Sequence, residues 1–171
     1  MTDEADYNDP DHCTVGVIGE VGHRLFLFYC RQGVSETTVK VEKQQISVLA
    51  SYLGRIVKEL GRPGHLPDDL SFDGSEDPEW VVGTIGVSYD EDLDRVVVVL
   101  EEVNDEEEEE EDAESGHVLR IALTREQAAA FAIHATRLVE AGRPPCPLCG
   151  LPLDPSGHDC PRTNGHRPPV T

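Results

Sequence analysis

The chain has 171 residues and a formal net charge of −20, from 34 acidic and 14 basic residues. This length allows one ordinary domain with a small appendage, and the charge disfavours binding to nucleic acid or anionic membranes, because both would be repelled. No apolar run has transmembrane length, and the acidic start from Met1 to Asp6 is unlike a signal peptide, so we expect a cytoplasmic protein.

Residues 1–11 are acidic and polar, and we predict a disordered tail there. Three strand-like segments follow at residues 13–19, 25–30 and 37–41, separated by short turns. The apolar period then becomes helical over residues 46–60, and a Gly and a nearby Pro end the helix. The first unit therefore has the order β-β-β-α.

The same order recurs after a polar linker from His65 to Glu79. The second unit begins with Val-Gly-Thr-Ile-Gly, which repeats the Val-Gly-Val-Ile-Gly of residues 15–19. We interpret these glycines as marking a bulge or a close packing contact rather than a nucleotide site, since no phosphate-loop pattern is present. The second unit comprises strands at 82–86, 95–100 and 118–123 and a helix at 128–139.

We therefore predict an α+β fold over residues 12–142, made by internal duplication of a β-β-β-α unit (repeats 13–64 and 80–142). Two such units can pack about a pseudo-twofold axis, with both helices covering one continuous antiparallel sheet. Thr124 and Gln127 have capping-box spacing at the start of the second helix.

An acidic insertion at residues 101–114 separates the second and third strands of the second unit, and it holds eleven of the acidic residues. Its charges repel one another, which favours an extended, solvated loop. The functional alternative is an electrostatic tether for a basic partner or a weak site for divalent cations. The spaced oxygens and central Gly of a calcium loop are missing, so we do not expect specific calcium binding.

The C-terminal stretch, residues 143–171, is predicted to form a zinc-ribbon-like tail. Its Cys-Pro-Leu-Cys-Gly segment is typical of a zinc knuckle, in which a turn brings two sulfurs together. We predict that Cys146, Cys149 and Cys160 bind Zn²⁺. The tail has few apolar side chains, so the metal would be structural and would supply its folding free energy.

The fourth zinc ligand is His158 or His166. We prefer His158, because it lies two residues from Cys160 and both side chains point the same way in an extended segment. A redox role for the first two cysteines is the competing interpretation, and it is disfavoured because no thioredoxin-like βαβ pattern precedes them.

The remaining reactive groups do not form a recognisable catalytic set, so we predict no catalytic and no cofactor-binding residues. Cys13 and Cys30 lie on strands that can face each other in a hairpin, and we expect free, buried thiols. His134 lies within a helix and is expected to pack rather than to bind a ligand. Four basic residues near strand ends and helix starts either line an anion pocket or form surface ion pairs: Arg31, Lys40, Lys43 and Arg120.

Three segments, at residues 41–50, 142–150 and 157–165, resemble an uncharacterised actinobacterial family, the domain-of-unknown-function family number three-thousand-ninety. The resemblance covers the chain from about Cys13 to Arg167. It implies that the His and Cys of the Gly-His-Asp-Cys-Pro motif recur, which favours His158 as a ligand. It also implies a phosphomutase-like and a kinase-like protein as associates. No activity is implied, so no catalytic residue follows from it.

From these patterns we expect a non-catalytic binding or adaptor protein that uses its structural zinc tail as a contact surface. An enzyme with its active site in the cleft between the two repeats is the alternative. A zinc-ribbon protein that binds nucleic acid is a second alternative, which the net charge disfavours.

Overall fold

The structure is a computed structural model that describes residues 3–20, 22–104, 116–141 and 146–150. It confirms a mixed α+β fold, and the order β-β-β-α occurs twice in it. The first set is β2 (His12–Ile18), β3 (Leu25–Gln32), β4 (Ser35–Val41) and α1 (Lys43–Leu60), preceded by β1 (Glu4–Tyr7). The second set is β5 (Val82–Asp90), β6 (Arg95–Glu102), β7 (Val118–Leu123) and α2 (Arg125–Glu140).

The strands form two sheets, so the expectation of one continuous antiparallel sheet is wrong. One sheet is the antiparallel meander β2-β3-β4, and the other has the order β1-β7-β6-β5. In the second sheet β5, β6 and β7 are antiparallel, whereas β1 is parallel to β7. Among the described strands, the two meanders do not pair with each other directly. The last strand of each meander instead pairs with a segment that precedes the other meander: β7 with β1, and β4 with Val81.

A short backbone junction joins the two sheets just before β5. The N–H of Lys40 in β4 donates to the carbonyl of Trp80 at 2.9 Å, and Lys40 and Val81 form a parallel bridge. The N–H of Val103, after β6, donates to the carbonyl of Val81 at 2.9 Å. The junction therefore takes hydrogen bonds from both sheets.

The predicted disordered tail over residues 1–11 is wrong for its described part, because residues 4–7 form β1. Exposure alternates along this strand: Glu4 and Asp6 face solvent, while Ala5 and Tyr7 pack against the core. The hydroxyl groups of Tyr7 and Thr37 are 2.8 Å apart and hydrogen-bonded. Burial of one tyrosine and the pairing with β7 together order this short acidic strand.

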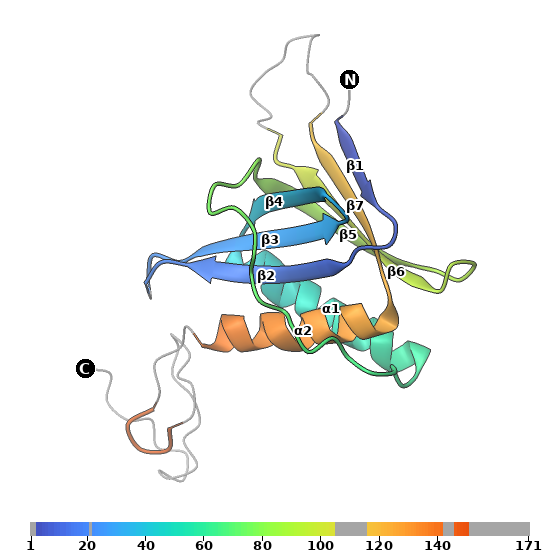
Figure 1. Cartoon of the computed structure of the whole chain (residues 1–171). Coiled ribbons are helices and arrows are strands. Elements are labelled where there is room, and N and C mark those ends of the chain that lie inside the picture. The colour runs from blue at the N-terminus through green and yellow to red at the C-terminus, as the bar shows by residue number, and fades with distance from the viewer. Residues whose placement is uncertain (1–2, 21, 105–115, 142–145, 151–171) are drawn as a thin grey trace.

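Both helices lie together against the two sheets and share one hydrophobic core with them (Figure 1). The predicted capping box is confirmed at α2, where the N–H of Gln127 donates to Thr124 Oγ1 at 3.1 Å and the N–H of Thr124 donates to Gln127 Oε1 at 3.0 Å. Phe28 of β3 meets Phe131 of α2 with ring centroids 5.3 Å apart. The helices bury one apolar face each: Ile46, Leu49, Leu53 and Val57 on α1, and Ala128, Phe131, Ala132, Ala135 and Val139 on α2.

Residues 61–81, here called the strap, run across the face of β2 and β3 that points away from the helices (Figure 1). The Thr14 hydroxyl donates to the Leu70 carbonyl at 2.7 Å, and the Phe72 ring packs edge-on against Tyr29. Gly16 lies directly under Phe72, and a bulge in the β5–β6 pairing lies at Gly83. Both glycines thus have the structural roles predicted for the repeated Val-Gly motif.

We predict that Gly16→Ala lowers the free energy of unfolding by about 1–3 kcal/mol, because a Cβ at this position meets the Phe72 ring and displaces the strap. Gly54→Ala in α1 is the matched control. No atom lies within 4 Å of its added Cβ, so alanine should stabilise the helix by about 0.5–1 kcal/mol. Urea unfolding of both variants measures the two effects, and equal changes would contradict the packing of Phe72 on Gly16.

Candidate functional site

A cleft of about 780 Å³ lies between the first half of α1 and strand β5. It therefore separates the helix of the first β-β-β-α set from the first strand of the second. Val48 and Tyr52 of α1 border it and are 60% and 43% exposed, so they add apolar surface to the cleft. The other lining residues are Glu42, Gln44, Gln45 and Leu49 of the α1 region and Gly83, Thr84, Ile85 and Val87 of β5.

The local sequence explains why the cleft stays open. Val48 and Tyr52 are four residues apart and lie together on α1, beside the stripe of buried residues. β5 is an edge strand, and residues 82–89 carry no charge and no proline, which edge strands normally use for protection. The Gln45 side chain reaches over this edge and donates to the carbonyls of Val82 and Gly83, both at 3.2 Å.

The cleft offers shape and apolar surface rather than reactive groups. Among its lining residues, Glu42 is the one carboxylate, Tyr52 the one phenol and Thr84 the one aliphatic hydroxyl, and none is a Ser, Cys, His, Lys or Arg. A general base must reach the proton that it removes, and nucleophilic catalysis needs a base beside its nucleophile. The lining is therefore suited to binding an apolar or extended segment.

The predicted zinc knuckle falls partly within the described residues. The N–H of Gly150 donates to the Cys146 carbonyl at 2.8 Å, and Gly150 has a φ of 76°, which favours glycine. The Cys146 side chain is buried, whereas Cys149 is half-buried. The other proposed ligands, His158, Cys160 and the alternative His166, lie outside the described residues.

The two core cysteines behave as predicted. Cys13 and Cys30 are directly opposite in the β2–β3 pairing, and both are buried free thiols. The hydrogen bond with Cys30, and then burial, raise the pKa of the Cys13 thiol well above its ordinary value. Since the thiolate is the nucleophile and the metal ligand, the raised pKa makes the Cys13 thiol unreactive.

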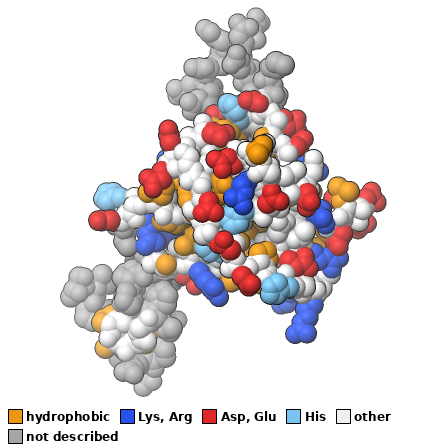
Figure 2. Space-filling view, viewed as in Figure 1, with side chains coloured by type: hydrophobic (Ala, Val, Ile, Leu, Met, Phe, Trp, Pro, Cys, Tyr) orange, Lys and Arg blue, Asp and Glu red, His pale blue; other side chains and the backbone are white. Residues whose placement is uncertain are grey.

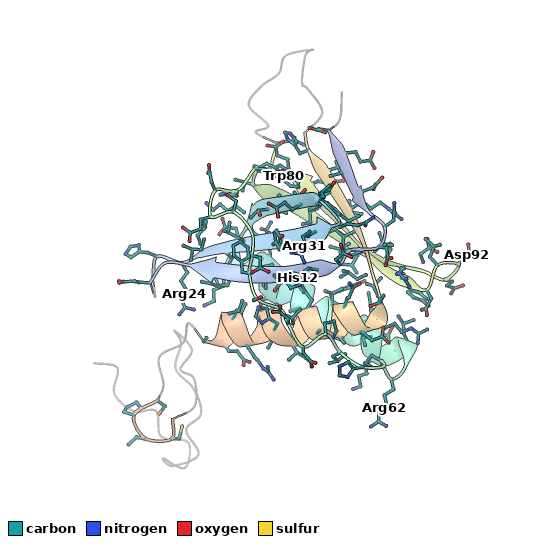
Figure 3. All side chains as sticks on the ribbon, in the orientation of Figure 1. His12, Arg24, Arg31, Arg62, Trp80 and Asp92 are labelled. Carbon is teal, nitrogen blue, oxygen red and sulfur yellow. The ribbon has the colours of Figure 1, made fainter. Side chains whose placement is uncertain are left out.

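The structure separates the four basic residues that the sequence suggested for an anion pocket. Lys40 and Lys43 lie close together beside Arg24, which the sequence reasoning missed. Arg31 is at the other end of the β2–β3 ladder, and Arg120 is on β7 in the second sheet. Figure 3 shows Arg24 well apart from Arg31 and His12. As expected, His134 packs: its Nε2 lies 3.0 Å from the carbonyl of Val15.

Comparison with known proteins places the chain in a family. A family model described as "Protein of unknown function (DUF3090)" matches residues 5–160. The chain belongs to this family. The match confirms the resemblance seen in the sequence. It spans both sheets and both helices of the DUF3090 fold and extends to Cys160, but it stops before His166.

No curated protein and no solved structure matches this DUF3090 chain. Neither helix of the described residues is long and apolar enough to cross a membrane.

A polar cluster lies where the acidic insertion leaves and rejoins the sheet. Glu102 Oε2 lies 2.7 Å from His117 Nδ1 and 3.0 Å from the backbone nitrogen of His117. The imidazole stacks on Trp80 with ring centroids 6.0 Å apart, and its Nε2 is 3.8 Å from Asp3 Oδ2. Bonding with Glu102 raises the pKa of His117, and bonding with His117 lowers the pKa of Glu102. In the described residues these groups do not form a metal-binding set.

This pair predicts a pH-dependent contribution to stability. Because the pKa of His117 is raised in the folded protein, its protonated form stabilises the fold fully below the ordinary value of 6.5. This stabilisation is lost as the pH rises through the pKa of His117 in the folded state. Because the pKa of Glu102 is lowered in the folded protein, its ionised form stabilises the fold fully above the ordinary value of 4.5. This stabilisation is lost as the pH falls through the pKa of Glu102 in the folded state. His117→Gln should therefore destabilise most between these values, by less than about 1 kcal/mol because the pair is half-exposed. Urea unfolding across pH 3–9 tests this, and a penalty independent of pH would contradict it.

Proposed function

We propose that this protein is a cytoplasmic zinc protein that acts as a non-catalytic binding or adaptor protein. Cys146, Cys149, His158 and Cys160 would hold one structural Zn²⁺, and the folded tail would present the contact surface. The turn at residues 146–150 is the observation that carries this proposal.

That turn has the features that a zinc knuckle needs. Its i to i+4 hydrogen bond closes the backbone into a turn that holds both cysteines, which are three residues apart. The glycine that follows takes the left-handed conformation and keeps its N–H directed into the turn. The remaining ligands follow within eleven residues of Cys149, which suits a small closed site.

The extent of the family match supports His158 as the fourth ligand. The match to residues 5–160 includes Cys146, Cys149, His158 and Cys160 and leaves out His166. A complete four-ligand site within the matched segment needs nothing from the residues that follow it.

The binding role is supported by the body of the protein as well as by the tail. The cleft between α1 and β5 offers apolar side chains and an open strand edge without a catalytic pair in its lining. The phosphomutase-like and kinase-like proteins implied by the resemblance are the proposed partners. An enzyme acting in this cleft is the alternative, and it would need groups supplied by a partner or by the substrate. Nucleic-acid binding is a weaker alternative, because the chain carries a net charge of −20.

We also infer that the two β-β-β-α sets arose by duplication. The repeated Val-Gly-x-Ile-Gly motif and the repeated element order support this. The reciprocal pairing supports it further. β1 precedes the first meander and is parallel to β7, and Val81 precedes the second meander and forms a parallel bridge to β4.

Purified full-length protein should contain about one Zn²⁺ per chain, and Cys149→Ser should lose it. Cys13→Ala is the matched control, because it removes a cysteine that is enclosed in the core, and it should keep the metal. Atomic absorption together with a colorimetric thiol and zinc assay measures both. A metal-free wild-type protein, or equal loss in the two variants, would overturn the zinc site.

The contact surface has a separate test with purified candidate partners. Cys146→Ser should weaken binding of the phosphomutase-like or kinase-like protein by tenfold or more, about 1.4 kcal/mol, because the unfolded tail loses its surface. Tyr52→Ala in the cleft distinguishes the two surfaces, and isothermal titration calorimetry measures each affinity. Unchanged binding by Cys146→Ser, with strong loss in Tyr52→Ala, would move the contact surface from the tail to the cleft.

A further inference from the structure

We propose that a basic pocket at the end of the β2–β3 hairpin binds the phosphate group of a small phosphorylated molecule. The pocket has a volume of about 410 Å³ and lies where β3 begins, β4 ends and α1 begins. Figure 3 shows Arg24 at this end of the first sheet. Three cationic side chains line it, from three different elements: Arg24, Lys40 and Lys43.

The charges at this pocket contrast with the rest of the protein. Acidic side chains are spread over the face shown in Figure 2, and the chain has 34 of them against 14 basic residues. Nevertheless, within the described part of the chain none of the three cations is in an ion pair. Glu42 is the single carboxylate in the lining, so its Arg, Lys and Glu side chains together carry a formal charge of about +2.

Arg24 adds an unsatisfied donor to this surplus of charge. Its Nε has no exposed surface and no hydrogen-bond partner, and it is the one buried side-chain nitrogen or oxygen in this condition among the described residues. A buried donor without a partner is costly, and an arginine donor is costlier still. An oxyanion in the pocket would accept this hydrogen bond and remove the cost once the Arg24 side chain turned to expose Nε to it.

Lys43 indicates an anion in the same place. It occupies the first position of α1, where the helix macrodipole disfavours a positive charge, and the N-cap residue Glu42 is the one carboxylate at this helix start, because the first turn has no acidic residue. The N–H of Glu42 is already bonded to Gln45 Oε1 at 2.8 Å, so the helix start alone does not make the site. A bound anion would offset the repulsion between the lysine and the helix start.

The chemistry of the lining favours a phosphate monoester. A planar guanidinium and two ammonium groups suit the tetrahedral oxygens of a phosphate, and the net charge of the pocket matches a dianion. Leu25, Phe26 and Val41 supply an apolar wall for a small organic group. The site is a hollow rather than a basic stripe, so it suits a small molecule and not a polyanion.

The test uses the full-length protein with inorganic phosphate, glycerol 3-phosphate and succinate, and it follows the amide shifts of Gly22, Lys40 and Lys43 by NMR. We expect saturable binding, with glycerol 3-phosphate tighter than succinate. Arg24→Gln and Lys40→Gln should each weaken it by about tenfold or more, because each removes a charge-assisted contact. Lys58→Gln, which removes an exposed charge at the other end of α1, should change affinity by less than about twofold.

Arg24→Lys separates hydrogen bonding from charge, since it keeps the charge but loses Nε, and it should bind more weakly than wild type and more tightly than Arg24→Gln. The proposal is overturned if neither phosphate compound binds saturably, or if Lys58→Gln weakens binding as much as the pocket variants do. Succinate binding as tight as that of glycerol 3-phosphate would overturn the assignment to phosphate.

Discussion

The two halves of this protein are held together by reciprocal backbone pairing. The segment before each meander adds in parallel to the third strand of the other meander: β1 to β7, and Val81 to β4. Buried N–H and C=O groups must find partners, so each meander depends on the other half to satisfy its last strand. The backbone of Val81 is held from both sides, because it is bridged to β4 while its carbonyl accepts the N–H of Val103. We therefore expect the two halves to unfold together rather than as independent units.

The two halves differ in what covers their first strands, and this difference creates the cleft. α2 is rich in alanine and approaches β2 closely enough for His134 to bond the carbonyl of Val15. The strap adds Phe72 over Gly16 on the same strand. α1 instead carries Val48 and Tyr52 beside β5, and these larger side chains leave an open hollow. The same element order thus closes one strand edge and leaves the equivalent edge available for binding.

Local patterns in the sequence were sufficient for strands β2 to β7, for both helices and for the capping box, because each depends on residues that are close in the chain. Ile46, Leu49 and Leu53 specify a helix wherever they pack. The strap was read as a linker, since its contacts with β2 and β4 come from single residues without periodicity, such as Phe72 and Trp80. β1 was missed because its charges hid the alternation of Ala5 and Tyr7. The cleft and the basic pocket depend on which distant segments meet, which one chain's local pattern does not contain.

The described cysteines lie in two different surroundings, and this difference bears on where a metal can bind. Cys13 and Cys30 are enclosed in the core, where their mutual hydrogen bond and burial raise the pKa of Cys13 and keep its thiol protonated. Zinc binds the thiolate, so it must displace a proton from each cysteine ligand, and a buried thiol with a raised pKa resists this. Cys146 and Cys149 lie instead on a turn beyond α2, where Cys146 is buried and Cys149 partly exposed, and neither belongs to the hydrophobic core of the sheets and helices. The raised pKa of Cys13 therefore makes the hairpin a poor place for zinc, whereas the proposed site in the tail has further Cys and His residues within a short stretch of chain.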